Sequence, residues 1–210
     1  MSQKMETPHL LRLVALTGII GPFLFAGMLT LLTILQYDFM RSLRWHPLMP
    51  IDWPSGLALG PYGIWMNVAF AGTGLVLMLF AWGLGQVFPA SKAWLLFLAS
   101  GLAMLMLCFP TDPTYRTTPM TWHGILHDSA YVLLGLSFIP GQLVLARHFA
   151  RSPEWKPYAG LTWWAVVIII PSFIIKGVAF YILLLTMLTW YELISLKIWK
   201  VASSPPLADH

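Results

Sequence analysis

The sequence predicts an all-α integral membrane protein, a bundle of six transmembrane helices. Hydrophobic residues make up 58% of the 210 residues, charged residues make up 10%, and the mean hydropathy is +0.74. Soluble domains carry about 25% charged residues, so a soluble fold is excluded. The apolar residues gather in runs of about 20, the length that a helix needs to cross a bilayer. Single basic residues separate these runs, and the net charge of +4 therefore does not indicate a nucleic-acid partner.

The first three predicted spans cover residues 13–36, 62–88 and 93–109. The first is longer than the apolar core of a signal peptide, about 7–15 residues, so we expect a retained helix. The sequence PASK at 89–92 predicts a tight turn between the second and third spans. Pro110 and Pro113 then prevent the third helix from continuing into the next connection.

The last three predicted spans cover residues 122–146, 158–175 and 177–198. Thr121 can cap the fourth span with its hydroxyl group, and a polar connection at 151–157 follows that span. Small residues in the second and third spans, among them Gly72, Gly74 and Gly101, predict close helix contacts, because lipid supplies no hydrophobic drive between helices.

The positions of Lys and Arg predict the orientation of the bundle. Eight of the twelve basic residues fall on the side of the two termini, and four fall on the other: Arg41, Arg44, Arg116 and Lys176. We therefore expect both termini in the cytoplasm, the connections at 37–61 and 110–121 outside, and the plasma (inner) membrane as the location. One transmembrane domain should cover residues 1–202, followed by a disordered tail at 203–210.

Ionisable side chains cluster in the stretch FPTDPTYRTTPMTWHGILHD, residues 109–128. His123, His127 and Tyr131 share one face of the fourth span because residues four apart align on a helix. Asp112 ends the third span at a similar depth. Asp128 lies about 100° around the helix from His127. A carboxylate inside a span costs about 2.5–3.5 kcal/mol, so Asp128 should face the bundle interior or water and have a partner.

Three interpretations of this cluster stay open, with Asn67, Tyr131, Ser55 and Arg116 as supporting residues. In the first, the cluster is structural and ties the outward loops to the bundle. In the second, His123, His127 and Asp112 bind a divalent metal such as zinc, with an open position for water. His123 and Asp128 would then take the catalytic roles, Asp128 as general base or as the group that orients a His. The HGILH sequence lacks the Glu of the HExxH motif. In the third, the cluster binds a lipid headgroup or a partner protein.

Several motifs resemble those of the family catalogued as domain of unknown function 998. They are Ser55, Leu57–Gly63 and Trp65 before and within the second span, FPTDP at 109–113, and Thr121, His123, Gly124 and His127. One departure is Ile64, which separates Gly63 from Trp65. The resemblance implies a polytopic bacterial membrane protein, and it implies no activity.

The predicted function is metal-assisted hydrolysis of a lipid or small amphiphile at the outer leaflet. The alternative is a non-catalytic accessory subunit or lipid-binding membrane protein, with membrane lipid or other membrane subunits as partners. A transporter is disfavoured, because the inner halves of the predicted spans show few polar residues to form a path.

Overall fold

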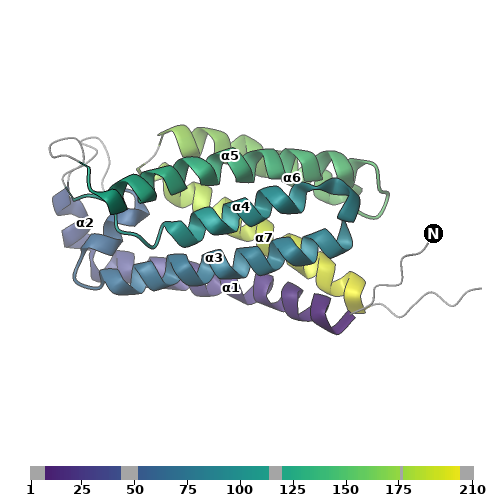
Figure 1. Cartoon of the computed structure of the whole chain (residues 1–210), viewed down its shortest axis with the longest axis horizontal. Helices are drawn as coiled ribbons and strands as arrows, with labels where there is room; N and C mark the ends of the chain where they lie inside the picture. Colours follow the sequence, from purple (N-terminus) through teal and green to yellow (C-terminus); the bar gives the residue numbers. More distant parts are fainter. Residues whose placement is uncertain (1–7, 44–51, 114–119, 176, 204–210) are drawn as a thin grey trace, which may run out of the picture.

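The computed structural model describes residues 8–43, 52–113, 120–175 and 177–203 (Figure 1). All regular structure in these residues is helical, which confirms the all-α class. The α-helices are α1 (Pro8–Leu35), α2 (Tyr37–Leu43), α3 (Gly63–Val87), α4 (Ala93–Met106), α5 (Trp122–Ala150), α6 (Lys156–Ile175) and α7 (Ala179–Ser203). Two short 3-10 helices, η1 (Pro54–Leu59) and η2 (Pro89–Ser91), lie before and after α3.

Among the described residues, five helices are long and apolar enough to cross a membrane: α1, α3, α5, α6 and α7. The sixth predicted span corresponds to α4, which has 14 residues. It is about 21 Å long, shorter than a hydrocarbon core of about 30 Å. The helix ends before residue 109 because the chain changes to i→i−3 bonds at Cys108 and Phe109, just ahead of Pro110. The six-span count therefore stays a prediction.

Two further parts of the predicted layout differ in detail. The outward connection at 37–61 is not simply a loop, since α2 and η1 lie in it. The tail predicted at 203–210 lies outside the described residues except for Ser203, where α7 ends.

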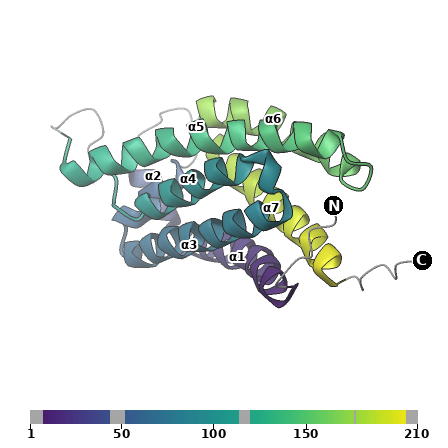
Figure 2. The same ribbon diagram turned by 45° about the vertical axis from the view of Figure 1, so that its right-hand side comes forward.

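The five long helices and the shorter α4 form a closed ring in the order α1, α3, α4, α5, α6, α7, each packing against its two neighbours. The Arg12 Nε–H of α1 donates to the Ala202 carbonyl of α7 at 3.1 Å, which joins the first helix to the last. The start of α1 and the end of α7 therefore lie at one end of the ring, here called the terminal end (Figure 2). The opposite end, with α2, η1 and residues 107–113, is the loop end (Figure 1).

The ring is apolar on its outside and aromatic on its inside. Leu24 and Ile174 are 68% and 71% exposed, and many other large apolar side chains point outward as they do. Such a continuous apolar surface is typical of a membrane-spanning bundle. Five buried aromatic side chains contact one another inside the ring: Phe80, Phe97, Phe138, Trp190 and Tyr191. The described residues thus form a multi-pass membrane protein with a packed centre.

The predicted close approach of the second and third spans is confirmed at Gly74 and Gly101. A Cβ on Gly74 would lie 2.7 Å from the Leu105 Cα and 2.8 Å from the Gly101 carbonyl oxygen, so α3 and α4 touch through their backbones. The expectation is wrong at Gly72, which is exposed and where a Cβ would have no neighbour within 4 Å. Whether a glycine of α3 allows close helix packing therefore depends on whether it lies on the face that contacts α4.

Replacing Gly74 with Ala should lower the free energy of unfolding of the purified protein by about 1–3 kcal/mol, the usual cost of overpacking. The new methyl group would meet backbone atoms of α4, which can make room only if the whole helix shifts. Gly72→Ala is the matched control on the same helix. It should be neutral or stabilise α3 by up to about 1 kcal/mol. Thermal unfolding in detergent compares the two. Equal midpoints for both variants would contradict the close approach of α3 and α4.

Candidate functional site

Asp112 and Thr121 join the end of α4 to the start of α5. One Asp112 carboxylate oxygen accepts the Thr121 backbone N–H at 3.0 Å, and the other accepts the Thr121 hydroxyl at 2.5 Å. The same hydroxyl accepts the Gly124 N–H at 3.1 Å, so the predicted N-cap is confirmed. A Cβ at Gly124 would collide with the Asp112 carboxylate, and a side chain there would prevent this approach. We call residues 107–113 with 120–127 the α4–α5 junction.

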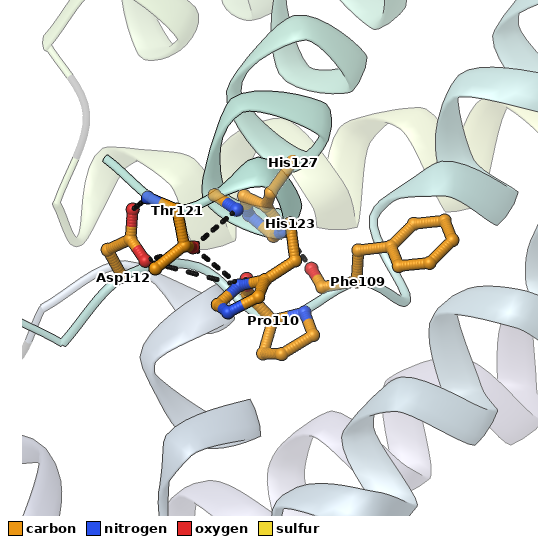
Figure 3. Close-up of polar contacts among 7 residues, drawn as sticks. Phe109, Pro110, Asp112, Thr121, His123 and His127 are labelled. Atoms are coloured by element: carbon orange, nitrogen blue, oxygen red, sulfur yellow. Dashed lines mark hydrogen bonds and ion pairs between the residues drawn. The ribbon is translucent and has the colours of Figure 1, made fainter. Parts of the chain in front are cut away.

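Both histidines of the junction bind backbone carbonyl groups (Figure 3). The Nδ1 atom of His123 lies 2.9 Å from the Pro110 oxygen, and that of His127 lies 2.7 Å from the Phe109 oxygen. Because a carbonyl oxygen only accepts, each Nδ1 carries the proton. In the neutral ring the Nε2 atom is then the acceptor, available as a base or a ligand. The two imidazoles therefore fasten the last residues of the α4 segment to α5.

The predicted metal ligands do not assemble into a three-ligand site. Within the described parts of the chain, no three His, Cys, Asp or Glu side chains come together as a metal site. Asp112 and His123 approach to 4.0 Å, but the Asp112 oxygens are already bound to Thr121. His127 binds a different carbonyl group. The residues present therefore do not fit the predicted ion.

A cavity of about 240 Å³ lies beside the junction at the loop end. Its lining comes from η1 and the residue before it, from α3, α5 and α7, and from the junction: Trp53, Ser55, Phe70, Leu107, Thr111, His127, Asp128, Tyr131, Val132 and Phe180. Asp128 directly follows His127 on α5, and both side chains line the cavity. The cavity therefore combines apolar walls with an acid, an imidazole and hydroxyl groups.

The structure divides the predicted site residues into two groups. His127, Asp128, Tyr131 and Ser55 line the cavity. Asp112 and His123 lie in the α4–α5 junction and do not line it. Asn67 is not among the lining residues, and its Oδ1 is buried without a partner in the described residues. Arg116 lies outside the described residues.

Gln36 holds η1 over the loop end, a role that no sequence pattern indicated. Its Nε2 donates to the Leu57 carbonyl at 3.2 Å, and its Oε1 accepts the Tyr62 N–H at 3.2 Å. The Gln36 side chain is 3% exposed, and Leu57 of η1 is fully buried. These two hydrogen bonds position η1, and with it Trp53 and Ser55 in the cavity wall. A single amide at the end of a long apolar run gave no signal of that contact.

The cavity lies next to the end of α6, where α5 extends past that helix. Tyr131 stacks on Phe173 with a centroid distance of 4.3 Å, and its hydroxyl donates to the Phe173 carbonyl at 2.6 Å. Phe173 lies two residues before the end of α6, while α5 extends nine residues from Tyr131 back to its start at Trp122, about 14 Å. This part of α5 therefore has no α6 beside it, and the lining residue Val132 is 50% exposed.

The ring and the cavity define a class: a multi-pass helical membrane protein with a mostly apolar cavity, containing a few polar groups, at one end of its bundle. Residues 19–197 match the family model described as protein of unknown function (DUF998). The chain belongs to this family, which confirms the resemblance of its motifs. No curated protein and no solved structure gives a significant match.

The hydrogen bonds from Thr121 predict a pH-dependent stability. The Thr121 hydroxyl, as the main cause, lowers the pKa of the Asp112 carboxyl below its ordinary value. A carboxylate with a lowered pKa in the folded state contributes its full stability above its unfolded pKa, about 3.9, and loses it as the pH falls through the folded pKa. We expect Asp112→Asn to lower the free energy of unfolding by about 1–3 kcal/mol at pH 7.

The difference in free energy of unfolding between the wild type and Asp112→Asn should become smaller below about pH 4, where the wild-type carboxylate also becomes protonated. Unfolding curves in detergent at pH 7 and pH 3 measure it. Thr121→Ser, which keeps both hydrogen-bonding groups, is the control and should retain the wild-type pH dependence. A difference of equal size at both pH values would show that the carboxylate form of Asp112 does not stabilise the junction.

Proposed function

We propose that this protein binds a lipid or a small amphiphile in the cavity at the loop end. The observation that carries the proposal is the composition of the cavity wall, in which apolar and aromatic side chains surround Asp128, His127 and Ser55. Ligand sites commonly have mostly apolar walls with a few polar groups that fix orientation. The cavity volume of about 240 Å³ is small for a whole lipid. It suits a headgroup, with the hydrocarbon chain remaining outside.

The exposed position of one lining residue, Val132, supports access from the bilayer. The exposed Val132 side chain lies at the edge of the cavity, on an outer face of α5 that also carries the exposed apolar residues Ile125 (50%) and Leu136 (69%). A chain lying against this face can keep its hydrocarbon part in lipid while its headgroup enters the ring. With the termini in the cytoplasm, as the distribution of Lys and Arg predicts, the cavity would face the outer leaflet of a bacterial inner membrane.

The α4–α5 junction has a structural role in this proposal. Asp112, Thr121 and His123 hold the start of α5 in place, and that helix carries His127 and Asp128 into the cavity wall. The first and third interpretations of the ionisable cluster thus apply to different residues. Asp112 and His123 are structural, and His127 and Asp128 belong to the binding site.

A larger side chain at Val132, the exposed lining residue of α5, tests the proposal. Val132→Trp should cover this edge of the cavity with an indole and reduce the amount of lipid that co-purifies with the protein at least several-fold. Native mass spectrometry of the protein released from mild detergent measures the bound lipid. The control is Val167→Trp, an equal change at a 55% exposed position of α6 that does not line the cavity. Equal lipid content in both variants would reject the cavity as the site.

Hydrolysis of the bound amphiphile is the second candidate, because Ser55, His127 and Asp128 line the same cavity. The His127 Nε2 atom can accept a proton from a water molecule or from Ser55 as that group attacks an ester carbonyl. The products would be a carboxylic acid and an alcohol. Asp128 next to His127 would stabilise the imidazolium ion that forms.

His127→Gln should abolish the release of fatty acid from an ester amphiphile, while the glutamine amide can still donate to the Phe109 carbonyl. His148→Gln, at the other end of the same helix, is the control and should leave turnover unchanged. Fatty-acid release is measured with the purified protein, with and without added zinc. No release by the wild type under either condition would reject a hydrolase and leave a binding protein. Equal release by His127→Gln would show that His127 is not the base and that the proposed site does not carry out the hydrolysis.

A further inference from the structure

Three polar side chains inside the ring have nothing to bind within the described residues. They are Gln142 of α5 and Tyr191 and Ser195 of α7, and all three residues are fully buried. Both polar atoms of the amide and the oxygen atoms of the two hydroxyl groups lack a hydrogen-bond partner in that part of the chain. We propose that water molecules bind inside the ring at this level, held by these side chains and by the Gly18 carbonyl group of α1.

Gln142 and Ser195 lie at one level of the ring interior. The helices α5 and α7 both run from the loop end to the terminal end (Figure 1), and the rings of Phe138 and Tyr191 lie 5.5 Å apart. Gln142 lies four residues after Phe138, which is one helical turn or about 6 Å nearer the terminal end. Ser195 lies four residues after Tyr191, the same step in the same direction. The site is therefore separate from the cavity at the loop end, and it does not depend on the proposed function.

The helix α1 supplies a further acceptor at this level. A Cβ at Gly18 would collide with the Ser195 hydroxyl, so this hydroxyl lies directly against the backbone of α1. Pro22 lies inside α1, four residues after Gly18. Because proline has no N–H, the Gly18 carbonyl loses its usual helical donor. The unpaired Ser195 hydroxyl thus touches a residue whose carbonyl group also needs a donor.

A direct hydrogen bond between Gln142 and Ser195 is disfavoured by the order of the helices. In the ring, α5 is separated from α7 by α6, and it is separated from α1 by two helices on either side. The Ser195 hydroxyl extends only one atom beyond its Cβ and lies against α1. Gln142 would therefore have to reach across the interior of the ring to bind it. Water molecules can bridge such a gap, because each of them both donates and accepts.

Water is the small ligand whose hydrogen bonds match these groups. An amide or hydroxyl group without a hydrogen bond is costly in the interior of a membrane-spanning bundle, where no solvent reaches it. A buried water molecule usually makes about three hydrogen bonds to such groups. Ordered water also binds carbonyl groups that proline leaves unpaired in membrane helices. The amide, the two hydroxyls and the carbonyl are uncharged, and water binds them without introducing a charge into the interior.

A crystal structure of the full-length protein, at a resolution that shows ordered water, tests the proposal directly. We expect density for water within hydrogen-bonding distance of the Ser195 hydroxyl and of the Gln142 amide. The structure of Ser195→Ala should lose the water molecule at that hydroxyl. A wild-type structure in which these side chains bind one another directly, or in which no water contacts them, would overturn the inference. Unchanged water density in Ser195→Ala would overturn it as well.

Thermal unfolding in detergent gives a second test. Gln142→Met keeps the length of the side chain but removes its hydrogen-bonding groups. If water binds the amide, the variant leaves that water without partners, and the unfolding midpoint should fall by several degrees. An amide that binds nothing would instead give an equal or higher midpoint when it is removed, and that result would overturn the inference. Gln86→Met, the same change at an exposed position of α3, is the control and should leave the midpoint unchanged.

Discussion

The Asp112 carboxylate bound to Thr121 is the interaction on which the loop end of the molecule depends. It satisfies two donors of Thr121, and the Thr121 hydroxyl in turn caps α5. A helix that starts at a fixed residue presents every later side chain at a fixed angle. The position of the cap therefore decides that His127 and Asp128 line the cavity, while His123 turns to the Pro110 carbonyl. This contact therefore fixes the start of α5, and with it the directions in which the polar side chains of that helix point.

The short length of α4 makes room for the cavity. The helix stops at Met106, and the chain continues to Thr111 at the loop end of the ring without helical structure. Two consequences follow from this one feature. The carbonyl groups of Phe109 and Pro110 have no helical partners, and they accept the two imidazoles of α5. The side chains of Leu107 and Thr111 replace a further helical turn in the cavity wall. Junction and cavity thus share a cause, the prolines that end α4.

The interior of the ring also contains polar groups that the sequence did not reveal. Gln142, Tyr191 and Ser195 are fully buried, and their side-chain polar atoms have no partner in the described residues. Gln142 lies fifteen residues beyond His127 on α5, and Ser195 lies fifteen beyond Phe180 on α7, so both lie about 22 Å from the level of the cavity. The half of the bundle nearer the terminal end is therefore more polar than its apolar runs suggested. Along α5, Phe138 lies between Gln142 and the cavity.

The sequence by itself determined the membrane class, the approximate helix ends and the cap at Thr121, because length, hydropathy and capping are properties of short segments. It also located the ionisable cluster. Only the tertiary structure decided the closure of the ring, the contact of Gln36 with η1, and the separation of His127 and Asp128 from Asp112 and His123. These features depend on how far each helix extends beside its neighbours and which face it turns inward. Such contacts join residues far apart in the chain, and no local pattern encodes them.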